Sequence, residues 1–358
     1  MHDLPPELMK RVHVHSHYRD VDYARLAAHY GRGYVARRLE RQLEIYDRVA
    51  RRAAHPVGRW LRPLHRRGLV AGLWMTGQLG RARRLARSPH WVEREVWLTS
   101  LPAAFDGYRI LHLTDFHFDY TPELAGILNA ALREVAFDVC VLTGDYRGED
   151  FGPYEESLSA LEEVRGALGE AVYAVLGNHD SLEIMLRLPE MGIRGLVNEA
   201  VWLERADSRI LMAGVDDGHW YRTHDFEPMR DQVSEAEMSV LLSHSPELFR
   251  EGAAEGYDLM LSGHTHGGQV CLPGGIPLVA HVKDTPREMI QGTWQWEGMQ
   301  GYTSRGAGTS SVDCRLFCPG EITVHILRRL ERTCPPRPSD PRTAEACGRS
   351  GEGAERRG

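Results

Sequence analysis

The spacing of apolar and polar positions divides the chain into three parts. From Tyr23 to about Ala54, apolar residues recur at three- to five-residue steps among many arginines, which predicts a helix. Residues 1–90 as a whole are therefore expected to form a basic, mostly helical N-terminal extension. Residues 91–330 contain short apolar runs separated by helical stretches and turns. Residues 331–358 are rich in proline, glycine and charge, which predicts a disordered tail.

The beginning of the extension is polar and contains His13, His15 and His17. We expect a solvated or locally strand-like arm there rather than a metal site, because nothing frames these side chains as a rigid site. Pro56 and Pro63 are expected to break the predicted helix, since proline removes a backbone donor and clashes with the preceding turn.

A second basic segment, residues 66–87, places Trp74 and other apolar residues next to arginines. This pattern fits an interfacial membrane helix, and it fits equally well a helix packed on a neighbouring domain. The longest apolar stretch, from Gly68 to Leu79, is too short to span a bilayer. Nucleic acid is disfavoured as a partner, because no nucleic-acid-reading module is visible.

Predicted strands and helices alternate through residues 91–330, which indicates an α/β protein. Helices are expected at residues 122–135 and 154–168, and the last strands are separated by turns. The predicted fold class is α/β, a two-sheet β-sandwich flanked by helices, with the helical basic extension in front of it. The expected strands cover residues 91–98, 108–114, 138–143, 171–176, 209–214, 239–243, 258–262, 294–296, 302–304 and 322–326.

The net charge of −7 conceals an asymmetry along the chain. Residues 1–100 carry 20 Lys and Arg against 9 Asp and Glu, whereas the remaining residues carry 23 against 41. A basic arm ahead of an acidic domain suggests contact with something anionic, a membrane surface or nucleic acid. The hydrophobic fraction of 42% and the mean hydropathy of −0.39 are typical of a soluble protein.

The cysteines and the N-terminus bear on the compartment. The six cysteines, at positions 140, 271, 314, 318, 334 and 347, lack the Cys-x-x-Cys spacing of zinc or redox sites, and a reducing compartment fits best. The N-terminus lacks the apolar core of a secretory signal peptide. The expected location is the cytoplasm, with peripheral contact at the inner face of the membrane as a further option.

Side chains that can bind metals follow five of the predicted strands. The carboxyl ends of strands in open α/β sheets are where ligands bind, so these side chains are expected to share one site. Each motif alone is also explained by an ordinary turn or helix cap, but five in this order indicate a metal site. In chain order, the candidate residues are Asp115, His117, Asp145, Asn178, His179, Asp180, His244, His264 and His266.

The composition of this set indicates which metals it would hold. Carboxylate, amide and imidazole ligands without a thiolate suit Mn, Fe, Zn or Co better than Ca, and they argue against a structural cysteine-bound zinc site. Seven of these nine residues, two Asp, one Asn and four His, are the candidate ligands. Seven ligands are too many for one transition ion and about right for two ions that share a bridging carboxylate. Such a pair of ions stabilises the attacking and leaving oxygens of an in-line displacement at phosphorus.

From about Leu101 to Leu327, the sequence resembles the calcineurin-like metallophosphoesterase superfamily, and within it the bacterial YkuE/YaeI-type phosphodiesterases. The motifs of the superfamily are Asp115-x-His117, Gly144-Asp145, Gly177-Asn178-His179-Asp180, His244 and Gly263-His264-Thr265-His266. The motifs of the YkuE/YaeI type are Ala213-Gly214-Val215-Asp216-Asp217, Gly267-Gly268-Gln269 and Ser304-Arg305-Gly306. The resemblance implies a hydrolase that uses two divalent metal ions (Mn, Zn, Fe or Co) to cleave phosphodiester bonds.

The resemblance also implies the role of each ligand. One ion would be bound by Asp115, His117 and His266. The other would be bound by Asn178, His244 and His264, and Asp145 would bridge them. The sequence departs from many members at Tyr146-Arg147-Gly148, where those members carry an acid three residues after the bridging aspartate.

The expected mechanism is attack by a hydroxide between the two ions, with the Asn178 amide helping to neutralise the phosphoryl oxygens. The side chains of neighbouring residues diverge, so His179 is not expected to be a ligand if Asn178 is one. His179 is expected instead to be the general acid for the leaving alkoxide. Asp180 or another carboxylate would orient it. Arg305 and Arg315 are interpreted as surface arginines in preference to contacts for anionic substrate groups.

Two other functions compete with phosphodiester hydrolysis. A pyrophosphohydrolase of a nucleotide-linked lipid, of the UDP-2,3-diacylglucosamine type, would explain a basic arm that docks on an anionic membrane. A non-catalytic metal-binding scaffold is disfavoured, because every expected ligand is present.

Overall fold

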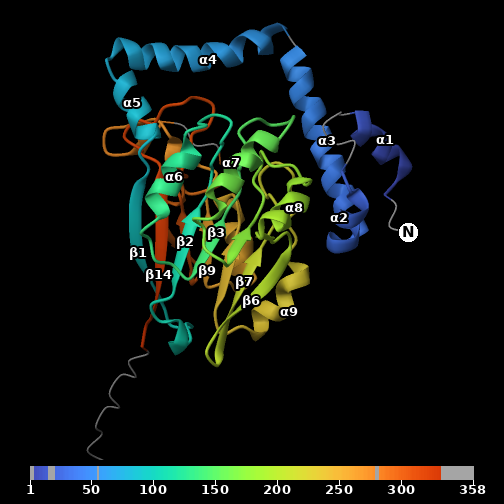
Figure 1. Ribbon diagram of the computed structural model, residues 1–358, viewed down its shortest axis with the longest axis vertical. Coiled ribbons are helices and arrows are strands. Elements are labelled where there is room, and N and C mark those ends of the chain that lie inside the picture. Colours follow the sequence, from blue (N-terminus) through green and yellow to red (C-terminus); the bar gives the residue numbers. More distant parts are fainter. Residues whose placement is uncertain (1–3, 15–20, 55, 279–281, 332–358) are drawn as a thin grey trace, which may run out of the picture.

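The computed structural model describes residues 4–14, 21–54, 56–278 and 282–331. Two six-stranded sheets pack face to face, with helices on their outer faces (Figure 1), so the expected two-sheet α/β sandwich is confirmed. The first sheet has the order β1 (His90–Leu98), β14 (Glu321–Arg329), β2 (Arg109–Leu113), β3 (Val139–Leu142), β4 (Val172–Ala174) and β5 (Arg194–Gly195). The second has the order β12 (Gly292–Trp296), β13 (Met299–Thr303), β9 (Leu259–Ser262), β8 (Ser239–Leu242), β7 (Ser208–Gly214) and β6 (Glu199–Arg205).

The core of the sandwich lies between the two sheets. Ile110 and Val141 from the first sheet meet Ile210, Val240 and Leu261 from the second, and all five are fully buried. Burying each such side chain stabilises the fold by roughly 1.5–3 kcal/mol. The short apolar runs of the sequence are therefore strands buried on both faces, as their continuous hydrophobicity predicts.

Helices cover the outer faces of both sheets. Helices α6 (Leu124–Leu132) and α7 (Glu155–Arg165) pack on the first sheet. Helices α9 (Arg230–Glu235) and α10 (Phe249–Ala254) pack on the second. The expected helices are present, and β6, an edge strand, is an element that the sequence pattern did not predict.

The strand directions place one set of loops at one end of the sandwich. Strands β2, β3 and β4 run parallel in the first sheet, and β7, β8 and β9 run parallel in the second. The carboxyl ends of parallel strands meet at the same edge of a sheet. The loops that carry the candidate metal-binding residues therefore converge.

Among its described residues, 4–14, 21–54 and 56–90, the N-terminal extension contains five helices. They are α1 (Pro6–Val14), α2 (Tyr23–Tyr30), α3 (Arg32–Ala54), α4 (Pro56–Met75) and α5 (Leu79–Ala86). The expectation of a solvated arm is wrong for residues 6–14, because this segment is a helix that buries Leu8 and Val12 in the core. His15 and His17 lie outside the described residues.

The prolines act differently from each other. Pro56 opens α4, at a position where a missing backbone N–H is tolerated. Pro63 was predicted to break a helix, but it lies inside α4. An interior proline can kink a helix instead of stopping it.

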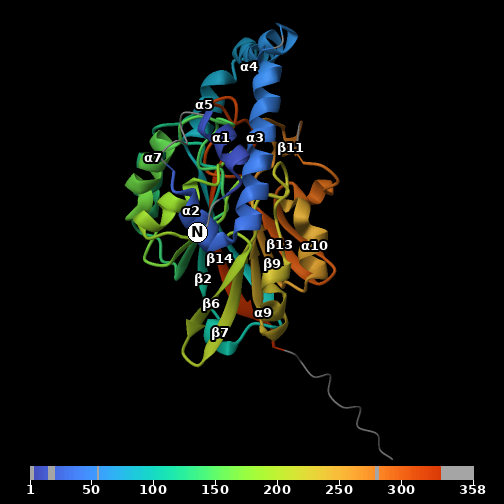
Figure 2. The ribbon, with the colours of Figure 1, turned by 90° about the vertical axis from the view of Figure 1, so that its right-hand side faces the viewer.

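The extension is attached to the sandwich at both ends. Leu26, Val35 and Leu39 of α2 and α3 belong to the same hydrophobic cluster as the first sheet and its covering helices. Figure 1 shows α4 crossing above the body from α3 to α5, and Figure 2 looks onto the face along which α3 runs. Leu73 of α4 and Ala82 of α5 then pack against the loop that carries Leu316. Within the described ranges, every helix is too short or too polar to cross a membrane.

Candidate metal centre

The candidate metal-binding residues sit where strands β2, β3, β4, β8 and β9 end, and several have an unusual backbone. Asp115, His117, Asp145, His264 and His266 all have φ between 44° and 69°. Left-handed backbone at a residue other than glycine costs on the order of 1 kcal/mol or more, and it persists only where the surrounding structure enforces it. Such strain at five residues of one site is typical of a functional centre.

Glycines allow the strand ends to approach one another. A Cβ on Gly177 would lie 2.1 Å from Oδ1 of Asp145, and a Cβ on Gly263 would lie 2.3 Å from Oδ2 of Asp115. Neither position has room for a larger residue. These glycines of the sequence motifs are therefore explained by close packing against the carboxylates.

The first group consists of Asp115, His117 and His266, all buried. Nε2 of His117 lies 3.0 Å from Nε2 of His266, and Nε2 of His266 lies 3.3 Å from Oδ1 of Asp115. One potential ligand atom from each of the three residues lies within 4.8 Å of the others. This group could hold a metal ion.

The second group consists of Asp145, His244 and His264, also buried. Nε2 of His244 lies 3.2 Å from Oδ2 of Asp145 and 3.1 Å from Oδ1 of Asn178. The same Oδ2 of Asp145 lies 3.6 Å from Nε2 of His117 in the first group. The Asp145 carboxylate thus lies close to a histidine of each group.

The hydrogen bonds around these imidazoles fit metal binding. Nδ1 of His117 lies 2.9 Å from the carbonyl oxygen of Arg147, and Nδ1 of His244 lies 2.7 Å from that of Thr143. A carbonyl oxygen only accepts, so each Nδ1 carries a proton, and in the neutral imidazole the Nε2 lone pair would face the centre. Histidine ligands of metals are commonly oriented in this way. The donor set therefore fits divalent cations.

The protonation preferences of the centre follow from burial and close charges. Burial raises the pKa of Asp115 to about 6 and lowers the pKa of His117 to about 4. Burial also disfavours charge on His244 and Asp145, but the attraction between them outweighs it. The pKa of His244 rises to about 10, and that of Asp145 falls well below its usual value. A cation is therefore the partner that these carboxylates favour.

His179 lies at the edge of the centre, with its ring 5.2 Å from that of His117. Its Nδ1 lies 3.1 Å from Oδ1 of Asp150. Burial alone would lower the pKa of His179, but the charges of Asp145 and Asp150 outweigh burial and raise it to about 9. The carboxylate beside His179 is therefore Asp150.

The carboxylate expected to orient His179 was Asp180 or another acid, and the acid in contact with its imidazole is Asp150. The Asp180 carboxylate instead accepts hydrogen bonds from the backbone N–H groups of Asp145, Tyr146 and Gly177, at 2.7, 3.0 and 2.8 Å. Asp180 therefore fixes the loop of Asp145 against the loop of Gly177.

The interpretation of Arg315 as a surface residue is wrong. Its guanidinium group is fully buried and donates to the carbonyl oxygens of Arg305 at 2.7 Å and Gly308 at 2.6 Å. Nη2 of Arg315 also lies 3.3 Å from Nδ1 of His266. Arg305 is partly buried and pairs with Glu321 at 2.5 Å. Both arginines brace the loops behind the centre.

The sequence reasoning missed a loop that borders the centre. His219 and Trp220 follow Asp216-Asp217, which served only as a family marker. The ring of His219 lies 4.3 Å from that of His264, and the ring of Trp220 lies 5.2 Å from that of His179. The histidine and tryptophan next to that marker were the available signal.

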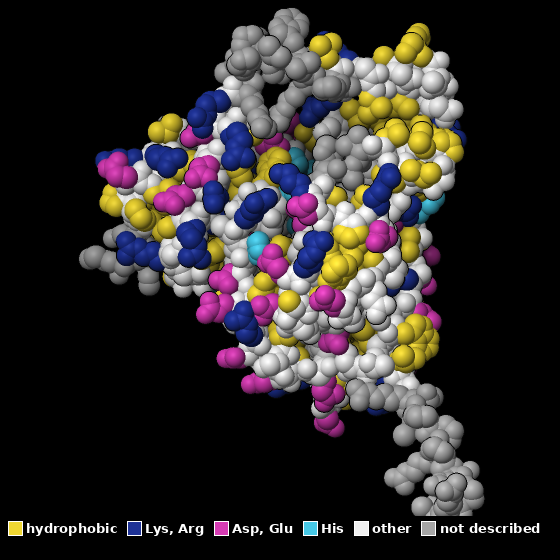
Figure 3. Space-filling model, turned by 180° about the vertical axis from the view of Figure 1, so that it is seen from behind, with side chains coloured by type: hydrophobic (Ala, Val, Ile, Leu, Met, Phe, Trp, Pro, Cys, Tyr) yellow, Lys and Arg dark blue, Asp and Glu magenta, His cyan; other side chains and the backbone are white. Residues whose placement is uncertain are grey.

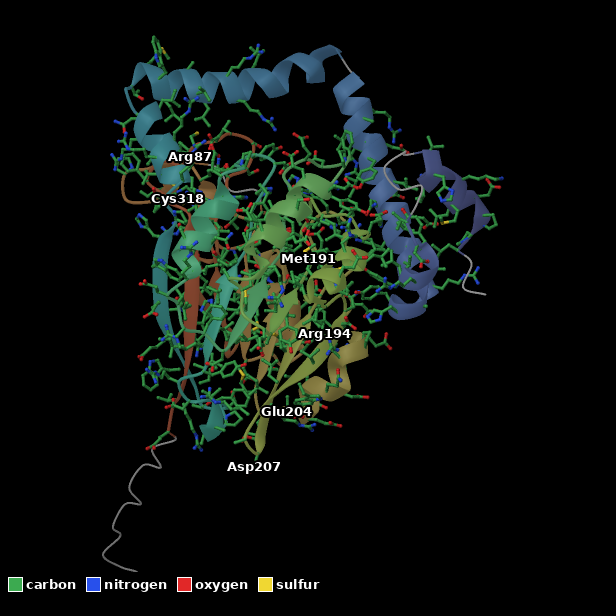
Figure 4. The ribbon with its side chains drawn as sticks, in the orientation of Figure 1. Arg87, Met191, Arg194, Glu204, Asp207 and Cys318 are labelled. Atoms are coloured by element: carbon green, nitrogen blue, oxygen red, sulfur yellow. The ribbon has the colours of Figure 1, made fainter. Side chains whose placement is uncertain are left out.

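The centre lies at the end of the sandwich nearest α4 and α5. The Sγ atom of Cys318, which lies 3.4 Å from the carbonyl oxygen of His266, is found at that end in Figure 4. Asp207, in the turn between β6 and β7, lies at the opposite end.

Buried carboxylate and imidazole groups at the ends of parallel strands of a two-sheet sandwich suit a metal-dependent phosphoesterase. A family model described as "Calcineurin-like phosphoesterase" matches residues 108–268. The chain belongs to the calcineurin-like metallophosphoesterase family, as its motifs predicted.

Three bacterial relatives illustrate the similarity. The chain is 31% identical over 225 residues to the uncharacterized metallophosphoesterase YkoQ of Bacillus subtilis (strain 168), covering 60% of this chain and 82% of the relative. It is 28% identical over 277 residues to the uncharacterized metallophosphoesterase YkuE of the same organism, covering 73% and 93%. It is 31% identical over 229 residues to phosphodiesterase YaeI of Escherichia coli (strain K12), covering 61% and 81%. The expected resemblance to the YkuE/YaeI type is confirmed.

Proposed function

We propose that the protein hydrolyses phosphodiester bonds at two divalent metal ions, drawn from Mn, Zn, Fe and Co. In this proposal Asp115, His117 and His266 bind one ion, and Asn178, His244 and His264 bind the other. Asp145 bridges the two ions. The observation that carries the proposal is the place of Asp145 Oδ2, within 3.6 Å of His117 Nε2 and 3.2 Å of His244 Nε2. A similarity to a named phosphodiesterase supports the diester as the substrate class.

When bound, the two ions would supply a nucleophilic oxygen and neutralise charge on the phosphoryl group. The protein supplies the remaining steps. The Asn178 amide can donate from its nitrogen to a phosphoryl oxygen while its Oδ1 faces the centre. His179 donates a proton to the leaving alkoxide, and Asp150 keeps the imidazole protonated and oriented. Asp180 acts indirectly, because it holds the backbone on which Asp145 sits.

The division of the chain forms part of the same proposal. Residues 91–330 would carry all the ligands, and residues 1–90 would serve as a basic helical extension. The predicted disordered tail lies outside the described residues, apart from Glu331.

A second candidate is a pyrophosphohydrolase of a nucleotide-linked lipid, working at an anionic membrane surface on the inner face. Residues 48–92 contain eleven arginines and no Asp or Glu. Trp74 and Met75, at the end of α4, are 71% and 73% exposed. Figure 3 shows hydrophobic side chains gathered at the end of the molecule where α4 lies. Exposed apolar groups beside arginines favour contact with anionic lipid.

The decisive experiment measures metal content and turnover on the same preparation. The manganese-loaded protein is tested on bis(p-nitrophenyl) phosphate, p-nitrophenyl phosphate and a UDP-linked lipid. Faster turnover of the diester supports the leading proposal, and faster turnover of the lipid supports the second. Full metal content without turnover of any of the three substrates would overturn both proposed activities. The protein would then be a non-catalytic metal-binding scaffold.

Membrane contact is tested separately by pelleting with vesicles of phosphatidylglycerol and phosphatidylcholine. We expect the double change Trp74→Ser and Met75→Ser to reduce pelleting, while Trp97→Ser, an exposed tryptophan on β1, leaves it unchanged. Point changes are preferable to deletion of residues 1–90, because α1 to α3 share the core of the first sheet. Equal pelleting by all three proteins would contradict membrane contact through α4.

A further inference from the structure

The loop of residues 216–222, between β7 and α9, presents partly exposed rings beside the metal centre. The residues of the two candidate metal groups are buried, whereas His179, His219 and Trp220 keep part of their surface exposed. The three rings form a row, with His179 5.2 Å from Trp220 and Trp220 stacked 6.4 Å from His219. Beyond His219 the row continues to His264 of the second group, at 4.3 Å. A substituent on a phosphorus atom at the centre can contact these rings.

His219 is held in place by carboxylates. Its Nδ1 lies 2.7 Å from Oε2 of Glu247, and Oε1 of Glu247 accepts a hydrogen bond from the backbone N–H of Lys283. The backbone N–H groups of His219, Trp220 and Tyr221 all donate to the Asp217 carboxylate, at 3.0, 2.6 and 2.8 Å. Both the ring and the backbone of His219 are therefore fixed before any substrate arrives.

Helix α3 of the extension supports the same loop from behind. Trp220 packs against Ile45 and Val49 of α3. The guanidinium of Arg38 lies 3.3 Å from the ring centre of Tyr221 and donates to Asp216 at 2.9 Å. The loop is consequently held by α3 as well as by the Asp217 carboxylate.

We propose that His219 and Trp220 form a substrate-binding wall that holds the ester group which is not cleaved, and that this contact favours diesters over monoesters. The inference rests on the proposed phosphodiester hydrolysis at this centre. His179 and His219 flank Trp220, each with its own carboxylate, so the two substituents of a diester can lie on opposite sides of the tryptophan. The leaving group faces His179, and the retained group lies against the Trp220 ring and the His219 edge. A monoester has no retained group and makes no use of His219.

The chain offers a matched control for His219. His224, five residues further along the chain, also pairs with a glutamate, with Nε2 3.0 Å from Oε2 of Glu251. It packs against Phe226. His224→Ala therefore removes a histidine–glutamate pair of the same kind from the same stretch of chain.

The test compares His219→Ala, His219→Asn and His224→Ala with the unchanged full-length protein, all loaded with manganese. Kinetic constants are measured for bis(p-nitrophenyl) phosphate and p-nitrophenyl phosphate, together with the inhibition constant of inorganic phosphate and the metal content. We expect His219→Ala to raise KM for the diester about tenfold, the size expected for a lost polar contact. KM for the monoester and the inhibition constant of phosphate should each change less than about threefold. His224→Ala should match the unchanged protein.

Two results would overturn the inference. His219 would only support His264 if both His219 variants lost metal. The same conclusion would follow if both variants bound diester, monoester and phosphate more weakly by an equal factor. Unchanged diester kinetics in both variants would show that His219 does not contact the substrate. Failure of the proposed function is read separately, from the unchanged protein, as an absence of diester turnover at full metal content.

Discussion

Arg38 in α3 donates a hydrogen bond from Nη2 to the backbone carbonyl of Asp180 at 3.0 Å, although the two residues are 142 positions apart. The same guanidinium pairs through Nε with Asp216 at 2.9 Å. Asp180 follows His179, and Asp216 begins the loop of His219 and Trp220. One buried side chain of the extension therefore ties together the two loops that carry the partly exposed rings of the centre.

Arg38→Met should lower both the free energy of unfolding and the turnover rate. The change leaves the buried Asp216 carboxylate without its cationic partner, which typically costs about 3–5 kcal/mol. We expect a loss of this size in urea unfolding, together with a lower kcat because the loops of His179 and Trp220 lose their common anchor. Arg41→Met is the control, since Arg41 lies one turn further along α3 in an exposed pair with Glu44. Equal stability of the two variants would contradict the anchoring role.

His179→Ala should reduce turnover while the metal content stays unchanged. His179 is proposed as the proton donor, and general acid catalysis contributes about 10²–10⁴-fold. The loss should grow as the leaving alcohol becomes more basic, so a series of aryl methyl phosphates is the measurement. A variant that loses metal, or whose rate falls equally for every leaving group, would argue against proton donation. Asp150→Asn should give the same trend with a smaller loss, because Asp150 acts only through His179.

Asp145→Asn should weaken the binding of both metal ions. Its carboxylate lies close to a histidine of each group, so one substitution removes a negative charge from both. We expect at least about tenfold weaker binding of both ions, measured by titration of the metal-free protein. Asp119→Asn is the control, because Asp119 accepts hydrogen bonds from the backbone of Gly148 and Glu149 and belongs to neither group. Loss of a single ion in the Asp145 variant would exclude a bridging position.

Much of the fold follows from local sequence. The continuous apolar runs before Asp115, Asp145 and His264 identify buried strands, and each metal-binding motif sits directly after its strand. The convergence of the motifs then follows from strand direction alone. Residues 6–14 were misjudged because their apolar contacts, Leu8 and Val12, are too few for a clear helical pattern.

The supporting residues of the site could not be predicted in this way. Asp150 and Glu247 are 29 and 28 positions from the histidines with which they pair, His179 and His219. Arg38 is 142 positions from Asp180, and nothing in the local sequence of these three residues marks them. Arg315 was misjudged because its burial depends on backbone carbonyl groups gathered from several loops. Such partners become visible only once the tertiary structure is known.

His112 should make the protein sensitive to acid. It is fully buried between Thr143 and His325, with Nε2 2.9 Å from Thr143 Oγ1 and Nδ1 3.3 Å from His325 Nε2. Burial lowers its pKa to about 4. The unfolded chain, in which a histidine has a pKa of about 6.5, therefore takes up the proton first.

The stability due to a neutral His112 is complete above pH 6.5 or so and declines as the pH falls toward about 4. Over that interval the free energy of unfolding should drop by about 3 kcal/mol from this residue. Burial also lowers the pKa of His325, which adds to the effect. The measurement is urea unfolding of the metal-free protein at several pH values, for the unchanged chain and for His112→Gln. The glutamine variant should show a flatter decline with acid because it removes the titrating group, whereas identical declines would place the acid sensitivity elsewhere.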